Sequence, residues 1–428
     1  MKLAVMGGGS SYSPELIDGL FSRLDRIPVT EVWMMDPDLA RLEITAGLSR
    51  RMAAKHGDPF KIHHTTDMRE AVRGADYVVT QMRVGGIQAR IQDEKLGLRH
   101  NIIGQETTGV GGFAKALRTI PRILDIAHAM EELAPGAVLL NFTNPSGIVT
   151  EAVLKHSKVK SVGLCNIPIG IVMEVVKYAG CKMEEVQLDY CGLNHLAWIK
   201  GFSIAGKDAT DQTLATLIKH SEDEWSNKAI CENMVAAMNS LHMWLNPYLQ
   251  YFYCTDEALA NQKSKPKTRG EEVIQIEKSL FEKYKQPELK EKPPELSKRG
   301  GAHYSTAAFY LIDAIHNDTC SVQVVCCKNN GAVPTFDDDC CVEVPARIGK
   351  DGAQALQQAA PSPAIRGLMQ NVKAYETLTV QAAVTGDREA AFQAMLEHPL
   401  MPGATKCRVL LDELLEINKP YLQGTFFN

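Results

Sequence analysis

The chain has 428 residues, a formal net charge of -5 and eleven cysteines. This length exceeds the roughly 250–300 residues that one core supports, so we expect two closely packed domains. The negative charge argues against nucleic acid as a partner, and no apolar run is long enough for a signal peptide or a membrane span. We therefore predict a cytoplasmic protein whose cysteines are reduced.

The first half of the chain alternates short apolar segments with helical patterns. Ser13 is predicted to cap a helix that has Pro14 at its first position and Glu15 in its first turn, and a long helix is predicted over residues 38–56. Strands are predicted at residues 3–6, 31–35, 77–82, 137–142 and 159–164. Strands that alternate with helices predict a parallel, doubly wound α/β sheet.

The pattern changes at about residue 197 to longer helical segments. These are interrupted by a lysine- and proline-rich surface stretch at residues 283–299 and by two apolar strands at residues 321–327 and 340–345. We therefore predict two domains, residues 1–196 and residues 197–428, of which the second is mostly helical with some strand.

A glycine loop follows the first predicted strand. Gly7 and Gly9 allow the backbone to approach a pyrophosphate, and the helix after them offers free N–H groups. Tyr12 stands where the usual GxGxxG motif ends in glycine, so a plain turn between strand and helix is the alternative. Asp36, at the end of the second strand, is placed to accept a hydrogen bond from a ribose and favours NAD over NADP. The alternative for Asp36 is a cap of the following helix.

A second candidate site consists of Cys165, which follows the predicted strand at residues 159–164, and His195. A thiolate and an imidazole suit a divalent transition metal, and two protein ligands leave positions open for catalysis. Cysteine and histidine also occur as buried core residues without a ligand. The residues alone leave both interpretations open.

Eight segments, in this order along the chain, together resemble one known family. They are residues 7–16 (GGGSSYSPEL), 83–86 (RVGG), 104–109 (GQETTG), 141–145 (NFTNP), 165–168 (CNIP), 192–195 (GLNH), 246–248 (NPY) and 299–301 (RGG). They are similar to glycoside hydrolase family 4, the NAD- and metal-dependent phosphoglycosidases, and in particular to its 6-phospho-β-glucosidases. The resemblance extends from residue 3 to about residue 420.

The resemblance implies a fold, two cofactors and a set of site residues. The fold is a Rossmann-type sheet like that of lactate and malate dehydrogenases, with a mostly helical α+β second domain. The residues implied to bind NAD are Gly7, Gly9, Ser10, Ser11 and Asp36, and those implied to bind Mn²⁺ or another divalent transition metal are Cys165 and His195. Those implied to bind the substrate are Arg90, Asn144, Asn166 and Arg269.

Tyr248 matches the family's base, which removes the proton at C2 of the sugar. Without the resemblance, Tyr248 is better interpreted as an interface aromatic beside Tyr251 and Tyr253, and Arg269 as part of a solvated basic loop. The 6-phosphate requires cations, and the candidates are Arg90, Arg269, Arg299, Lys263, Lys265 and Lys267. His303 is either a phosphate contact or the start of a surface helix.

Asn166 bears on the type of glycosidic bond. Members that act on α-linked 6-phosphoglycosides tend to have an aspartate there, and asparagine is not a useful proton donor. The resemblance therefore implies hydrolysis of 6-phospho-β-glucosides, such as cellobiose 6′-phosphate or aryl glycosides, by oxidation at C3, deprotonation at C2, elimination and addition of water. The alternatives are a lactate/malate-type dehydrogenase and a non-catalytic NAD sensor. The family also implies a homodimer or homotetramer.

Overall fold

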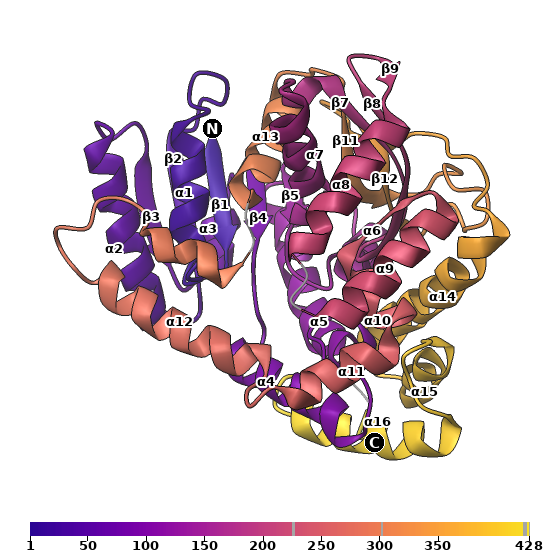
Figure 1. Ribbon diagram of the computed structural model, residues 1–428. Coiled ribbons are helices and arrows are strands. Elements are labelled where there is room, and N and C mark those ends of the chain that lie inside the picture. The colour runs from indigo at the N-terminus through magenta and orange to yellow at the C-terminus, as the bar shows by residue number, and fades with distance from the viewer. Residues whose placement is uncertain (225–226, 301–302, 423–425, 428) are drawn as a thin grey trace.

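A mixed β-sheet extends through the molecule (Figure 1). The computed structural model describes residues 1–224, 227–300, 303–422 and 426–427, so Gly301 of the segment at 299–301 lies outside the described residues. Within these ranges the sheet has 13 strands, in the order β10-β8-β7-β12-β11-β6-β5-β4-β1-β2-β3, with β9 paired to β8 and β13 to β12.

The N-terminal part of the sheet is parallel, which confirms the predicted fold class. Its strands are β1 (Lys2–Met6), β2 (Glu31–Met35), β3 (Lys61–Thr65), β4 (Tyr77–Thr80), β5 (Val138–Asn141) and β6 (Lys160–Gly163). All but β3 were predicted within two residues at each end. The sequence of β3, KIHHT, offers one buried apolar side chain, Ile62, so it carries no apolar run to detect.

The helices of this part are α1 (Ser13–Phe21), α2 (Leu39–Lys55), α3 (Met68–Val72), α4 (Gly86–Arg99), α5 (Gly109–Leu133), α6 (Ser146–His156) and α7 (Asn166–Ala179). The prediction that Ser13 caps α1 is wrong. Tyr12 occupies the cap position, and its side chain makes no capping hydrogen bond. The Ser13 hydroxyl donates to the Gly8 carbonyl at 2.7 Å. The cap of α2 is Asp38, which accepts from the Arg41 N–H at 3.1 Å.

Antiparallel strands extend the same sheet in the second part of the chain. They are β7 (Val186–Leu193), β8 (Leu196–Ile204), β9 (Lys207–Asp208), β10 (Trp244–Leu245), β11 (Ser321–Lys328), β12 (Cys341–Gly349) and β13 (Gly352–Ala355). Strand β11 joins the two parts by pairing Cys326 with Gly163 of β6. The boundary predicted after residue 196 falls within the β7–β8 hairpin and the sheet crosses it, so the division into two domains stays a prediction.

The remaining helices are α8 (Thr210–Glu224), α9 (Lys228–Leu241), α10 (Gln250–Tyr253), α11 (Thr255–Ser264), α12 (Arg269–Tyr284), α13 (Tyr304–His316), α14 (Pro363–Thr385), α15 (Arg388–Glu397) and α16 (Ala404–Asn418). Short 3₁₀ segments are η1 (Met183–Glu185), η2 (Pro247–Leu249) and η3 (Pro294–Arg299). Helix α12 packs against α2 and α4, which connects the N-terminal helices to the later part of the chain (Figure 1). Among the described residues, no helix has the length and apolarity that a membrane crossing requires.

Candidate active site

A cavity of about 1040 Å³ lies at the carboxyl ends of the parallel strands. Its walls come from the residues that directly follow β1, β2, β4, β5 and β6, and from η2, α12 and the end of η3. This edge is where ligands bind in open parallel sheets. The sequence-predicted residues that line it are Gly7, Gly9, Ser10, Asp36, Arg90, Asn144, Asn166, Tyr248 and Arg269.

The glycine loop forms a tight backbone cradle at one end of the cavity. Gly7 has φ +88°, a conformation that side chains disfavour, and a Cβ on Gly9 would lie 2.9 Å from the Asp36 carboxyl carbon. The Gly9 N–H donates to Asp36 Oδ2 at 3.0 Å, and the Asp38 N–H donates to Oδ1 at 3.0 Å. Asp36 therefore braces the loop and does not cap α2. The cradle fits a dinucleotide, because backbone can approach a pyrophosphate closely there.

Ser11 does not line this cavity. Its side chain is fully buried, and the hydroxyl donates to Glu277 of α12 at 2.9 Å. Glu277 also binds Arg41 at 3.3 Å and Arg299 at 3.2 Å, so this carboxylate ties the cofactor loop to α12 and to the end of η3. The Ser11 side chain thus holds the loop in place from behind, whereas Ser10 faces the cavity.

Cys165 and His195 come from different parts of the sheet. Cys165 follows β6 and caps α7, where its sulfur accepts from the Ile167 N–H at 3.5 Å. His195 lies in the two-residue turn between β7 and β8, with φ +65°. Neither lines the large cavity, but their neighbours Asn166 and Tyr248 do. The Tyr248 ring stacks on the His195 ring, with centroids 3.9 Å apart and planes 1° from parallel.

The protonation of these two residues suits a metal site. Burial lowers the pKa of His195 to about 3, assisted by the positive charge of Lys115, so the imidazole is neutral and free to act as a ligand. Burial and the nearby Glu343 carboxylate raise the pKa of Cys165 to about 12, so a bound cation must displace the thiol proton. Among the described residues, no group of three or more His, Cys, Asp or Glu is placed to hold a metal ion, so Cys165 and His195 would bind one as a pair.

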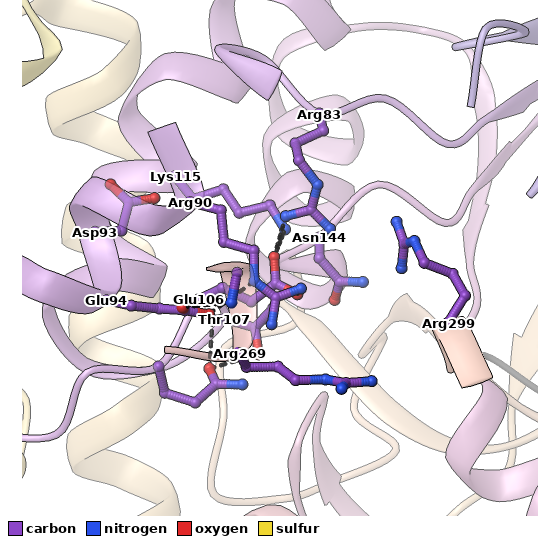
Figure 2. Close-up of polar contacts among 12 residues, drawn as sticks. Arg83, Arg90, Asp93, Glu94, Glu106, Thr107, Lys115, Asn144, Arg269 and Arg299 are labelled. Carbon is purple, nitrogen blue, oxygen red and sulfur yellow. Dashed lines mark hydrogen bonds and ion pairs between the residues drawn. The ribbon is translucent and has the colours of Figure 1, made fainter. Parts of the chain in front are cut away.

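A buried charge cluster forms another wall of the cavity (Figure 2). Glu106 pairs with Lys115 at 3.0 Å, with Arg90 at 2.7 Å and with Arg83. Burial alone would raise the pKa of Glu106, but the three cations hold it well below its usual range. Burial lowers the pKa of Lys115 to about 7, against the opposing attraction of Glu106. Sequence reasoning missed Glu106 and Lys115. The available signal was a lysine and an arginine, Lys115 and Arg118, inside the mostly apolar first half of α5, residues 109–120.

The residues predicted to bind the substrate differ in whether their polar atoms already have hydrogen-bond or ion-pair partners. Asn144 Oδ1 is buried and has no hydrogen-bond partner among the described residues. Arg90 is held by Glu94 at 2.7 Å as well as by Glu106. Arg269 is half-exposed, pairs with Glu272 at 3.0 Å and donates to the Lys298 carbonyl at 3.2 Å.

The predicted cations divide into two groups. Arg90, Arg269 and Arg299 line the cavity, and so does Arg83, which was not predicted. Figure 2 shows the Arg83, Arg269 and Arg299 side chains around the Asn144 amide. The lysines at 263, 265 and 267 do not line the cavity, and His303 precedes the first turn of α13 without lining it either.

Family models match both parts of the chain. The "Family 4 glycosyl hydrolase" model matches residues 2–181, and the "Family 4 glycosyl hydrolase C-terminal domain" model matches residues 190–401. The chain belongs to glycosyl hydrolase family 4. The resemblance seen in the eight sequence segments is thereby confirmed.

Full-length family 4 relatives give the same result. A probable 6-phospho-β-glucosidase of Bacillus subtilis is 42% identical over 440 residues, covering 100% of this chain and 98% of its own. The 6-phospho-β-glucosidase of Escherichia coli is 38% identical, covering 99% and 96%. The 6-phospho-β-glucosidase of Thermotoga maritima, solved with manganese, NAD⁺ and glucose 6-phosphate, superposes with a TM-score of 0.92 at 35% identity, covering 99% and 100%.

A more distant structural likeness concerns the sheet. Malate dehydrogenase of Cryptosporidium parvum matches with a TM-score of 0.57 at 16% identity, covering 90% of this chain and 98% of its own. At this identity the match supports the fold alone, and it confirms the predicted likeness of the fold to malate dehydrogenase.

Proposed function

We propose that this family 4 chain hydrolyses 6-phospho-β-glucosides, cellobiose 6′-phosphate among them, with NAD⁺ and Mn²⁺ as cofactors. The observation that carries the proposal is the stacking of Tyr248 on His195, which puts a phenol of the cavity wall beside one of the two proposed metal ligands, in a cavity that the glycine loop also lines. A hydrolase needs no such cradle unless oxidation and reduction occur within its cycle.

The site residues are proposed to bind NAD⁺, the metal and the sugar hydroxyls. Gly7, Gly9, Ser10 and Asp36 would hold NAD⁺, and Cys165 and His195 would hold Mn²⁺. When bound, NAD⁺ would supply reversible hydride transfer at C3 of the sugar, and Mn²⁺ would act as a Lewis acid on the sugar oxygens. Asn144, with its unpartnered buried oxygen, would accept a hydrogen bond from a sugar hydroxyl, and Asn166 would bind another.

Tyr248 is the proposed base at C2. Once C3 is a carbonyl, the C2 proton is acidic, and its loss expels the β-linked aglycone from C1 before water adds there. Burial raises the pKa of Tyr248, as does the neighbouring Tyr251 hydroxyl, so the base depends on positive charge close by. Arg90 supplies part of it, since its guanidinium lies in the same cavity and interacts with the phenol.

Two features support the β-linked substrate over the α-linked one. Asn166 lines the cavity where an acid would be needed to protonate an α-linked leaving group. In addition, relatives named 6-phospho-β-glucosidase are 36–42% identical to this chain, whereas relatives named phospho-α-glucosidase or maltose-6′-phosphate glucosidase are 29–30% identical. We infer that the aglycone leaves without a side-chain acid at position 166.

The 6-phosphate is proposed to bind among Arg83, Arg269 and Arg299, which line the cavity around the Asn144 amide (Figure 2). A buried dianion is tolerated only with charged or multiple hydrogen-bond partners. Phosphate specificity predicts that p-nitrophenyl β-glucoside is cleaved far more slowly than its 6-phosphate by the same enzyme preparation. Equal rates would contradict it. The predicted homodimer or homotetramer and the cytoplasmic location stay predictions.

The decisive experiment is hydrolysis in D₂O with NAD⁺, Mn²⁺ and a reductant. Deprotonation at C2 predicts deuterium at C2 of the product sugar and a slower reaction for substrate deuterated at that carbon. A displacement at C1 by carboxylates never breaks the C2–H bond, so product with its C2 hydrogen intact would overturn the mechanism. The dehydrogenase alternative predicts stoichiometric NADH, measured by its near-ultraviolet absorbance, whereas the proposed cycle accumulates none.

A further inference from the structure

Glu343 is a buried carboxylate for which the proposed reaction has no task. It lies on β12, is 1% exposed, and faces Gly192 of β7 on one side and Cys326 of β11 on the other. No Lys, Arg or His of the described residues lies within 4.0 Å of it; its partners are neutral donors. Tyr190 donates to Oε2 at 2.5 Å, and Asn194 and Cys326 donate to Oε1 at 3.0 and 3.5 Å.

Asn194 lies against this carboxylate and near Cys165. Its Nδ2 donates to Glu343 Oε1 at 3.0 Å. Burial raises the pKa of Cys165, the Glu343 carboxylate adds to the rise and the Asn194 side chain opposes it, so both groups are close to the thiol. Glu343 therefore holds an amide that lies next to one proposed metal ligand.

The same residue anchors the turn that carries His195. Asn194 and His195 are the two turn residues between Leu193 of β7 and Leu196 of β8. His195 adopts φ +65°, an uncommon conformation for a residue with a side chain. The Glu343–Asn194 hydrogen bond holds one end of this turn against β12, and the Tyr248 ring holds the imidazole.

We propose that Glu343 is a positioning residue which, through the Asn194 amide, fixes the turn that carries His195 beside Cys165, so that both side chains can bind one divalent metal. The inference rests on the proposed function only in taking Cys165 and His195 as the metal ligands. Groups that orient metal ligands typically change metal affinity 10- to 100-fold when they are removed.

The test uses Co²⁺ in place of Mn²⁺, because a cysteine thiolate bound to Co²⁺ gives a charge-transfer absorption band. The variants are Glu343→Met, Asn194→Ala and the double variant. The matched control is Tyr190→Phe, which removes the hydrogen bond to the other oxygen of Glu343 and leaves Asn194 untouched. Circular dichroism and NAD⁺ affinity check that each variant is folded. If Glu343→Met does not fold, Asn194→Ala is the variant that tests the proposal. In that variant the Glu343 carboxylate still accepts hydrogen bonds from Tyr190 and Cys326.

We expect each single variant to bind Co²⁺ about 10- to 100-fold more weakly with a reduced band, and Tyr190→Phe to change the affinity by less than about threefold. Because both residues act through one contact, the double variant should be no weaker than Asn194→Ala by more than about threefold. Three results would overturn the positioning role. They are an unchanged Co²⁺ affinity in both single variants, a loss in the double variant equal to the product of the two single losses, or a loss in Tyr190→Phe as large as that in Glu343→Met. A wild-type protein without the band, or a band that survives in Cys165→Ser, would overturn the metal site itself.

Discussion

The two ends of the cavity are built in different ways. The cofactor end is mostly backbone: Gly7 and Gly9 follow one strand, and Asp36 follows the next and accepts two N–H groups. The other end depends on side chains from distant segments: Tyr248 of η2 lines the cavity and stacks on His195 of a hairpin turn, and Cys165 follows β6. A site made of consecutive backbone depends on a few local residues. A site made of distant side chains depends on the packing that brings them together.

The largest expected effect tests the side-chain end. Tyr248→Phe should lower turnover by about 10²- to 10⁴-fold, the usual contribution of a positioned base, while NAD⁺ affinity is unchanged because the ring still stacks on His195. Turnover of p-nitrophenyl 6-phospho-β-glucoside and NAD⁺ titration measure the two quantities. The matched control is Tyr251→Phe, whose ring lies 6.0 Å from that of Tyr248. An equal loss in both variants would mean that disturbed packing, and not the lost base, lowers the rate.

Stability provides the next test of this end. Glu106→Gln removes the carboxylate shared by the buried Lys115 and Arg90 and the partly exposed Arg83, and it leaves Lys115 without its ion pair, so we expect a loss of about 3–5 kcal/mol in the free energy of unfolding at pH 7. The folded-state pKa of Glu106 is lowered, so its contribution is present above the unfolded value near ~4.3 and is lost as the pH falls below it.

Chemical denaturation at pH 7 and at progressively lower pH measures this difference. The gap between wild type and Glu106→Gln should narrow as the pH falls. The exposed Glu132, which pairs with Arg69 on the surface, offers the control variant Glu132→Gln, whose stability should match the wild type. A gap that stays constant with pH would show that the ionised form of Glu106 is not what stabilises the cluster.

The backbone end should respond to a single methyl group. Gly9→Ala places a Cβ 2.9 Å from Asp36 and 3.2 Å from Arg41, so we expect a loss of about 1–3 kcal/mol in stability and weaker NAD⁺ binding. Gly47→Ala, within α2, meets only an arginine nitrogen at 3.5 Å and should instead stabilise by about 0.4–1 kcal/mol. Thermal denaturation and NAD⁺ titration compare the two. Equal NAD⁺ affinity in Gly9→Ala and Gly47→Ala would show that the glycine loop is not part of the NAD⁺ site.

The smallest expected effect concerns Asp36. Asp36→Asn keeps an acceptor but loses the charge, so NAD⁺ should bind about 1 kcal/mol more weakly, the difference between charged and neutral hydrogen bonds. The control is Asp38→Ala, which removes the α2 cap and should lower stability by about 0.5–2 kcal/mol without changing NAD⁺ affinity. Equal NAD⁺ affinity of Asp36→Asn and Asp38→Ala would show that Asp36 supports the glycine loop and does not bind NAD⁺.

The same contrast explains what the sequence could predict. Five strands of the parallel sheet and the glycine cradle are written in short contiguous segments, and they were found from residues alone. Strand β3 was not, because it carries one buried apolar side chain. The β7–β8 hairpin was also missed, although residues 186–190 of β7 alternate between apolar and polar side chains. Cys165, His195 and Tyr248 are single residues far apart, and only the family resemblance brought them together. Glu106 and Glu343 could not be found from spacing, since their partners come from other elements.

The continuous sheet also determines how the chain can be divided. Strand β6 is covered along one side by β5 and along the other by β11, which belongs to the later part of the sequence. A fragment that ends at residue 181 would leave β6 as an open edge beside a large apolar core, and open apolar edges recruit other chains. We therefore expect either half, expressed alone, to aggregate, and the two halves to become soluble only when they are produced together.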